Sequence, residues 1–456
     1  MRGKSGFEGQ QRHVAILAMA LLAFAVCFGG ASRQHELRLA MVELAALPLI
    51  VLALPKVLQG PDWPNYRRGL WLLAAIAALP LIQLIPLPPN VWASLPHRQE
   101  LSLALDLAGL PAGWIPLSLT PDRTWRSFLA LLPPIGMYLA ILAMPPRARL
   151  WLVYGVLAAA LGAVLLGAAQ VASGGEQLYP WRTTSAGAVV GFFANRNHLA
   201  TLCLVAVPFI AVLGARAVRR GAESSRLHLW LATLSMGLVI VALGIIRSRT
   251  GIVLVGPVLV ASLLAGWIGA GRGQIRGFLL AIMAVSGAAI AAVALIALPP
   301  LIERFDKLGN PEGRLENWPI VAEAAETYLP FGSGIGSFDA VFRSVEPLNT
   351  LDPTFFNQAH NDYLETWLET GLFGAALLLA FLIWFGRRAW GAWREDASTR
   401  SDLRRASTIG IVVILAHSAV DYPLRTATIA TILALMCGLL EATGDPASKR
   451  RRSAGT

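Results

Sequence analysis

The sequence predicts an all-α polytopic membrane protein with about twelve transmembrane helices and a large loop that contains short helices. Two observations lead to this fold class. First, 55% of the residues are hydrophobic and only 14% are charged, with a mean hydropathy of +0.59. Second, several apolar runs reach the roughly 18–20 residues that cross a bilayer as a helix. We predict spans at 14–31, 38–55, 69–87, 126–144, 150–172, 198–215, 229–246, 250–270, 277–299, 366–386, 406–421 and 426–441.

The Lys and Arg residues set the predicted orientation. The net charge is +11, but the basic residues stand in short clusters between apolar runs, which argues against a nucleic-acid partner. With both termini in the cytoplasm, the cytoplasmic loops would hold 24 of the 38 Lys and Arg residues. Short cytoplasmic loops of membrane proteins carry such an excess. We therefore expect a multi-pass membrane protein with both termini in the cytoplasm.

The predicted spans divide the chain into three parts. Residues 1–190 hold the first five spans. Residues 191–386 form a central part that includes a large predicted outer loop, 300–368. Residues 387–456 hold the last two spans and a basic cytoplasmic tail.

The predicted outer loop ends in Gln358-Ala359-His360-Asn361-Asp362-Tyr363-Leu364-Glu365, directly before an apolar run. Asp362 and Glu365 have a spacing like that of a capping box, so we expect a helix to begin there. The positive end of that helix would favour the neutral form of His360, which can accept a proton. On this stretch alone, a catalytic histidine and an incidental histidine beside a helix cap are equally good interpretations.

Two short polar motifs stand at predicted outer ends of spans. Asn195-Arg196-Asn197-His198 opens a span where one Asn would suffice as a cap, so we favour substrate binding or support of a neighbouring loop. Arg247-Ser248-Arg249-Thr250-Gly251 is a tight turn whose side chains and backbone could donate hydrogen bonds to a phosphate. A plain turn with snorkelling side chains explains one arginine better than two.

Arginines gather near the predicted outer ends of spans. A charge at that depth is costly unless it is paired or functional, and the guanidinium fork suits phosphate oxygens. We expect a polyanion site, although snorkelling accounts for two of the seven, Arg182 and Arg343. The others are Arg196, Arg247, Arg249, Arg314 and Arg425.

Two further polar residues stand near the last predicted turn. Asp421 either pairs with an arginine of the predicted polyanion site or caps its own turn, and the sequence leaves both open. We expect His417, which lies inside its span, to be a packed, hydrogen-bonded residue.

The remaining loop motifs predict no cofactor. Pro330–Phe338 contains Gly-x-Gly-x-Gly, but no parallel sheet supports a nucleotide site, so we interpret it as a glycine-rich turn. The outer loops contain no Asp-x-Asp pair and no His, Asp and Glu cluster with metal-ligand spacing, so we predict no metal. Arginines would then have to neutralise the charge of any diphosphate.

Together these segments resemble the O-antigen ligase and O-antigen polymerase superfamily of bacterial membrane glycosyltransferases. The resemblance covers about residues 190–380. It implies an inverting, metal-independent transfer of a glycan from an undecaprenyl-diphosphate carrier at the periplasmic face of the bacterial inner membrane. Two arginines and a histidine are essential in the ligases of the family, and they match Arg249, Arg314 and His360. The resemblance rests on Gly191–Ala200, Ser248–Gly251, Arg314 with Trp318, Pro330–Phe338 and His360–Glu365.

These matches give a hypothesis for each residue. We expect His360 to be the general base and Arg249 and Arg314 to bind the diphosphate. The expected partners are an undecaprenyl-diphosphate-linked glycan donor, a lipid A-core or growing polysaccharide acceptor, and membrane lipids. The other residues expected to bind substrate are Arg196, Arg247, Asn195, Asn197, His198, Asn361, Tyr363 and Asp421.

The acceptor separates the functions within the superfamily. We favour ligation to lipid A-core, and a polymerase that joins repeat units is the main alternative. Members of the superfamily that glycosylate proteins usually carry an additional C-terminal region. Because this chain stops soon after the last predicted span, at Lys449-Arg450-Arg451-Arg452, we disfavour transfer to protein. A transporter or flippase would usually show two similar halves and polar residues near the bilayer midplane, and we find neither. A purely structural membrane protein leaves the outward arginines unexplained.

Overall fold

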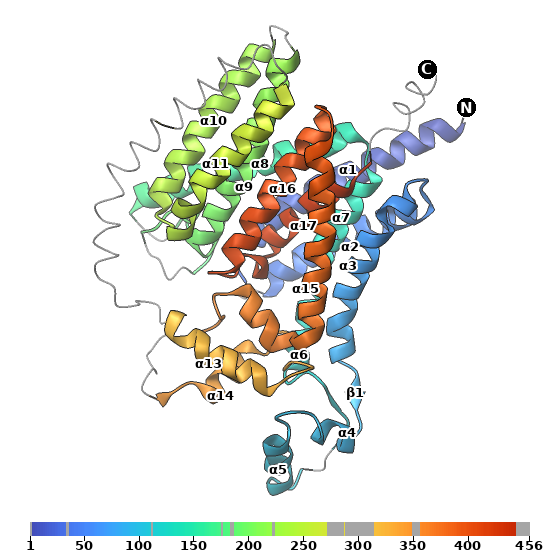
Figure 1. The fold of residues 1–456 in the computed structure, drawn as a ribbon, viewed down its shortest axis with the longest axis vertical. Coiled ribbons are helices and arrows are strands. Elements are labelled where there is room, and N and C mark those ends of the chain that lie inside the picture. The colour runs from blue at the N-terminus through green and yellow to red at the C-terminus, as the bar shows by residue number, and fades with distance from the viewer. Residues whose placement is uncertain are drawn as a thin grey trace.

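Long helices that lie side by side make up most of the molecule (Figure 1). The computed structural model describes residues 2–32, 36–110, 113–174, 177–182, 187–220, 224–270, 287, 314–348 and 356–443. The long helices are α1 (Arg2–Phe28), α2 (Glu36–Gln59), α3 (Trp63–Gln83), α7 (Leu132–Ala143), α8 (Pro146–Ser173), α9 (Arg196–Arg220), α10 (Ser224–Ile246), α11 (Arg249–Ala270), α15 (Asp362–Arg394), α16 (Thr399–Ser418) and α17 (Ala427–Glu441). The shorter elements are α4 (Pro89–Ala93), α5 (Gln99–Leu107), α6 (Pro121–Leu129), α13 (Arg314–Thr327), α14 (Phe338–Val345), the 3₁₀ turn η2 (Pro423–Arg425) and the antiparallel pair β1 (Pro86–Leu87) and β2 (Ile115–Pro116).

Seven described helical segments are long and apolar enough to cross a membrane, and each coincides with a predicted span. They are Glu36–Gln59, Pro121–Ala143, Pro146–Ser173, Arg196–Arg220, Arg226–Ile246, Arg249–Ala270 and Asp362–Arg394. The predicted all-α polytopic fold is thereby confirmed.

The other five predicted spans have different outcomes. Two of them, 14–31 and 426–441, fall on shorter apolar helices. The spans predicted at 69–87 and 406–421 fall on α3 and α16. The one at 277–299 lies outside the described residues apart from Gly287. The count of twelve stays a prediction.

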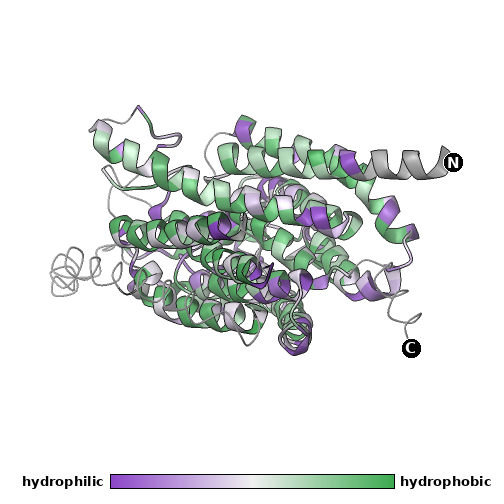
Figure 2. Ribbon diagram, turned by 90° about the horizontal axis from the view of Figure 1, so that it is seen from above, coloured by the Kyte–Doolittle hydropathy of each residue, from purple (hydrophilic) through white to green (hydrophobic). Residues whose placement is uncertain are grey.

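Helix α9 forms the centre of the bundle. In its apolar segment 94% of the residues are buried, against 22% in α2. It packs against α10, α11 and α16. By contrast α2 leaves Leu44 and Val51 63% and 69% exposed. Figure 2 shows hydrophobic residues on the outward faces of the helices as well as between them, as a lipid-facing surface requires.

Contacts between helix ends define the two ends of the bundle. Thr428, at the start of α17, donates its backbone N–H to the Gly29 carbonyl and its hydroxyl to the Ala25 carbonyl, at the end of α1. Ala194, just before α9, donates to the carbonyl of Gly30. The starts of α9 and α17 therefore lie beside the end of α1. We call this the loop end, and the opposite one, with the start of α1 and the end of α17, the terminal end.

The described part of the predicted outer loop, residues 314–348 and 356–368, forms a small helical layer at the loop end (Figure 1). Helices α13, α14 and the first turns of α15 share a core of their own, which includes Val321, Phe338, Phe342 and Leu368. The predicted large loop with short helices is confirmed for the described residues. This layer covers the ends of the spanning helices and holds the segment that contains His360.

Gly371 divides α15 into two helices. Its φ of 55° and ψ of −141° lie in a region that is open to glycine and strained for other residues. A Cβ at this position would also lie 2.3 Å from the carbonyl oxygen of Pro330. Residues 362–370 therefore pack into the layer at the loop end, and residues 372–394 continue along the bundle.

Candidate active site

His360 stands directly before α15, in a left-handed backbone conformation with a φ of 50°. The cap of the helix is Asn361, whose side-chain oxygen accepts the N–H groups of Tyr363 and Leu364, both at 3.1 Å. The helix therefore begins one residue earlier than a cap at Asp362 would place it. The predicted Asp362–Glu365 capping box is wrong, because Asp362 accepts from the Ser418 hydroxyl and Glu365 from the N–H of Ala359.

The imidazole of His360 is held by a buried carboxylate. Its Nδ1 lies 3.3 Å from Oδ1 of Asp421, whose side chain is 1% exposed, while that of His360 is 15% exposed. When Nδ1 donates to this carboxylate, the lone pair of Nε2 is left to accept a proton. The ring of Tyr422 packs edge-on against His360 at 4.7 Å between centroids, and Phe356 lies at 5.6 Å on another side. The imidazole ring of His360 is thus fixed in orientation and partly exposed.

Asp421 is itself held by the polar motif that precedes α9. Its Oδ2 accepts from Asn197 Nδ2 at 2.7 Å and from Asn195 Nδ2 at 3.4 Å, and its Oδ1 also accepts the N–H of Tyr422. The oxygen of Asn195 accepts the N–H of Asn197, which fixes the turn. Three segments far apart in the sequence therefore meet at one carboxylate. The sequence interpretations of Asp421 did not anticipate its contact with His360.

The other two residues of the polar motif lie beside this centre. His198 is buried between the rings of Phe193 and Tyr422. Arg196 begins α9 and is half-buried. One turn further, Thr201 Oγ1 lies 2.8 Å from Nδ1 of the fully buried His417, so the prediction of a packed, hydrogen-bonded His417 is confirmed.

The arginine turn between α10 and α11 lies next to the start of α9. The Ser248 hydroxyl accepts the N–H of Gly251 and caps α11. A Cβ on Gly251 would lie only 3.1 Å from that of Ala200, so the first turns of α11 and α9 pack tightly together. Arg247 and Arg249 are both exposed on this turn, as predicted, and Arg247 has a φ of 54°.

Helix α13 is tied to the segment that holds His360. Trp318 donates its indole N–H to the carbonyl of Ala359, the residue before His360, at 2.9 Å. Arg314 is the first residue of α13 and lies four positions before Trp318, which places both on one face of the helix. The side chain of Arg314 lies outside the described part of the structure.

The glycine-rich segment is a packed turn, as the sequence predicts. Glu369 Oε1 accepts the N–H groups of Gly336 and Phe338, and Gln83 Oε1 accepts that of Ile335. The backbone donors that would hold a phosphate in a nucleotide loop are therefore already used. Through Gln83 the turn joins the end of α3 to the layer at the loop end.

Arg425 has a structural role that the sequence analysis missed. Its guanidinium lies 3.0 Å from Glu369, 3.3 Å from Glu365 and 3.7 Å from Asp362, all on one face of the first half of α15. Burial alone would lower the pKa of Arg425, but these carboxylates outweigh it and raise the pKa above its ordinary value. The expectation that Arg425 joins a polyanion site is therefore wrong. The spacing of the three acids along one helix face was the available signal.

Two more residues predicted to bind substrate make internal contacts. Asn361 caps α15, and the hydroxyl of Tyr363 donates to the carbonyl of Leu415 at 2.6 Å. Arg343, which the sequence analysis assigned to snorkelling, pairs with Asp339 at 2.8 Å. Among the described residues, no group of three or more His, Cys, Asp or Glu side chains is placed to hold a metal ion.

Residues 234–379 match the family model described as O-antigen ligase. The match supports a relationship of this region to the O-antigen ligase and polymerase superfamily. The resemblance seen in the sequence is thereby confirmed. No curated protein matches the chain significantly. The match supports a membrane enzyme of the glycosyltransferase-like O-antigen ligase or polymerase type, which acts on lipid-linked glycans.

The O-antigen ligase-type region contains only part of the candidate site. Arg247, Arg249, Arg314 and His360 lie within the matched residues. Asp421 and the asparagines before α9 lie outside them and reach His360 through the packing of α9, α16 and α17. Asp421 is the one acid between Asp402 and Glu441, and its place directly after an apolar span was the sequence signal for a buried functional carboxylate.

Proposed function

We propose that the protein transfers a glycan from undecaprenyl diphosphate to an acceptor hydroxyl of lipid A-core, with inversion at the anomeric carbon and without a metal. The observation that carries this proposal is the contact of Asp421 with His360, in a chain whose residues 234–379 match the O-antigen ligase family. A histidine whose Nδ1 is held by a buried carboxylate is suited to act as a general base.

The first part of the proposed mechanism activates the acceptor. Nε2 of His360 takes the proton of the acceptor hydroxyl while the oxygen forms its bond to the anomeric carbon. Asp421 keeps the imidazole in place and stabilises the imidazolium that forms. Asn195 and Asn197 hold the carboxylate in turn, and the ring of Tyr422 limits rotation of the imidazole.

The second part stabilises the leaving group. Undecaprenyl diphosphate departs as the bond between the anomeric carbon and the phosphate oxygen breaks, and it needs charge stabilisation more than it needs an acid. We assign this role to Arg249 and Arg314, with Arg196 and Arg247 in support, because guanidinium groups match phosphate oxygens. Arg249 is exposed on a turn that packs beside the start of α9. Attack from the side opposite the diphosphate inverts the anomeric centre.

We further propose that the loop end faces the periplasm and the terminal end the cytoplasm. Arg147, Arg149, Arg387, Arg388, Arg400 and Arg404 lie at starts or ends of helices at the terminal end, as the positive-inside rule requires. Labelling of single cysteines introduced in α13 and α14 with a membrane-impermeant reagent tests this orientation. Labelling only after the membrane is opened to the cytoplasm would contradict it and would favour a transporter.

The glycan profile of a strain that lacks the gene tests the reaction, with lipopolysaccharide separated from undecaprenyl-linked material. A ligase leaves the lipid A-core bare and long polymer on the carrier. Core that bears a single repeat unit would instead identify a polymerase that shares this donor. An unchanged lipopolysaccharide and carrier profile, with restored wild-type gene as the control, would contradict both.

A further inference from the structure

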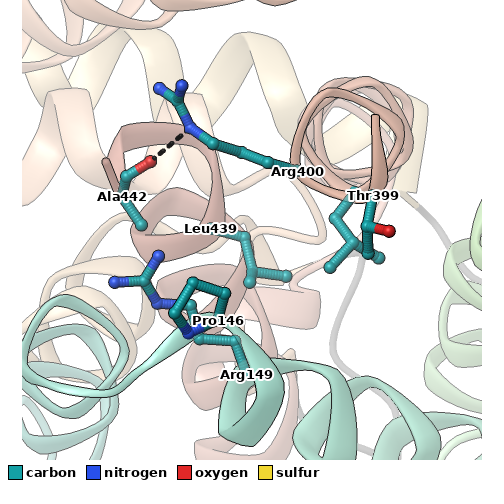
Figure 3. Close-up of a pocket in the computed structure, with 7 residues that line it drawn as sticks. Pro146, Arg149, Thr399, Arg400, Leu439 and Ala442 are labelled. Atoms are coloured by element: carbon teal, nitrogen blue, oxygen red, sulfur yellow. Dashed lines mark hydrogen bonds between the residues drawn. The ribbon is translucent and has the colours of Figure 1, made fainter. Parts of the chain in front are cut away.

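Figure 3 shows a pocket in close-up. Its lining residues belong to the terminal end of the bundle, at the opposite ends of the helices from His360. The pocket is formed where α8 and α16 begin and α17 ends. It contains about 370 Å³ of space, part of it open to the surroundings. Its lining includes Pro146, Arg149, Thr399, Arg400, Leu403 and Leu439.

Two arginines give this pocket a positive charge. Arg149 is 93% buried (7% exposed), and it donates to the carbonyl oxygens of Ile141 and Thr443, both at 2.9 Å. Among the described residues, no carboxylate lies within ion-pair distance of Arg149. Arg400 donates its Nε to the Ala442 carbonyl at 3.0 Å, and its nearest acid, Glu395 at 3.7 Å, also pairs with Arg404. Carbonyl groups orient these guanidiniums but do not cancel their charge.

The remaining lining is apolar. Leu403, Leu439 and Pro146 contribute hydrocarbon, and in Figure 3 Leu439 lies between Arg400 on one side and Pro146 and Arg149 on the other. A ligand that fits both features carries a negative group and a hydrocarbon portion. A free phosphate would leave the leucines uncovered.

Exposed aromatic residues indicate the level of the membrane at which the pocket lies. Trp151, at the start of α8, is 67% exposed, and Trp390, near the end of α15, is 64% exposed and lies under the guanidinium of Arg394. Exposed tryptophans beside arginines are typical of the headgroup level of a membrane. Basic pockets between membrane helices at this level suit anionic lipid headgroups.

We propose that this pocket binds an anionic membrane phospholipid. The phosphate lies between Arg149 and Arg400, with the Thr399 hydroxyl in reach, and the first carbons of an acyl chain cover Leu403 and Leu439. The bound lipid joins the starts of α8 and α16 to the end of α17. This proposal does not depend on the reaction proposed for the loop end.

The test uses the full-length protein in nanodiscs of phosphatidylcholine with a rising fraction of phosphatidylglycerol. The readouts are the unfolding midpoint and the phosphatidylglycerol retained in native mass spectrometry after exchange into detergent. We expect phosphatidylglycerol to raise the midpoint of the wild type and to be retained. Arg400→Gln, a change at a half-buried position, should require about five-fold more phosphatidylglycerol for the same rise.

Two further variants separate a pocket from diffuse surface attraction. Arg147→Gln removes the same charge from an exposed position on α8 that is not part of the lining, and it should leave retention unchanged. Leu403→Trp keeps every charge but fills the pocket, and it should abolish retention. Equal losses in Arg147→Gln and Arg400→Gln, no dependence on phosphatidylglycerol, or the same rise with inorganic phosphate alone would each overturn the proposal.

Discussion

At the terminal end, most of the buried and half-buried arginines are paired with acids. Arg388 binds Glu441 at 2.5 Å, Arg404 pairs with Glu395, and Arg219 and Arg405 share Asp402. At the loop end the arrangement is reversed. The buried acid Asp421 holds a histidine and two amides, while Arg247 and Arg249 are exposed.

This difference separates structural charge from functional charge. An ion pair inside a helix bundle uses up both of its charges, so it can fix the helices but offers little to a ligand. A carboxylate that holds a neutral imidazole instead prepares a group that changes its protonation state. Arg425, with its three carboxylates, shows that the loop end also contains structural charge of the first kind.

Removal of the proposed base should have the largest effect. His360→Ala should lower the transfer rate by about 100- to 10,000-fold, because no other group would take the proton of the acceptor. The measurement is transfer by purified protein at equal amounts, with His228→Ala, an exposed histidine on α10, as the control. Transfer at the wild-type rate in His360→Ala would sink the assignment of the base.

The second-largest effect should follow the loss of Arg425, the structural arginine at the loop end. This change should lower the stability of the protein and not the rate of the chemical step. Arg425→Met should lower the free energy of unfolding by about 3 kcal/mol, since three carboxylates lose their cation. Removing one partner of a buried ion pair costs roughly 3–5 kcal/mol. We take the lower end of this range because 21% of the Arg425 side chain is exposed.

Arg388→Met at the terminal end is the matched comparison, with the unfolding midpoint as the readout. It should cost less, because Glu441 keeps the hydroxyl of Tyr138 as a donor. A larger loss in Arg388→Met than in Arg425→Met would contradict this account of the two ends.

The change Asp421→Asn tests whether the carboxylate prepares the histidine. An amide would donate to Nδ1 and favour the wrong tautomer, so the turnover rate should fall on the order of 100-fold. The fall should be smaller than in His360→Ala because the partly exposed ring can still reorient. Asp396→Asn, an exposed acid at the terminal end, serves as the control. An unaltered rate in Asp421→Asn would mean that the contact is only structural.

The smallest effect is expected from a change that keeps the charge at the loop end. Arg249→Lys should slow transfer about tenfold, because an ammonium cannot make the two parallel hydrogen bonds of a guanidinium to a diphosphate. Arg387→Lys, exposed at the terminal end, should have no effect on the same assay. Full activity in Arg249→Lys would show that net charge alone matters.

Much of the fold could be predicted because apolar runs are local signals. The spans at 38–55 and 198–215, for example, coincide with α2 and α9. The break at Gly371 was missed because glycine is also tolerated inside apolar helices, and only the close approach of Pro330 reveals why it is needed. The cap was placed one residue late because Asn361 and Asp362 are both good caps.

The candidate site was predictable in its members but not in its connections. The sequence pointed to His360, Asn195, Asn197 and Asp421 as separate polar interruptions. They meet only because the helices that carry them pack together. His360 and Asp421 are 61 residues apart in the sequence, and Asn197 and Asp421 are 224 residues apart. No local pattern encodes such a contact.

The break at Gly371 also matters for how the protein responds to bilayer thickness. A membrane span tilts to match the thickness of the hydrocarbon around it. Residues 362–370 are anchored to the loop end through Glu369 and Arg425, whereas 372–394 belong to the span. We therefore expect a change of tilt to be taken up near Gly371, so that it is not transmitted to the contact of His360 with Asp421.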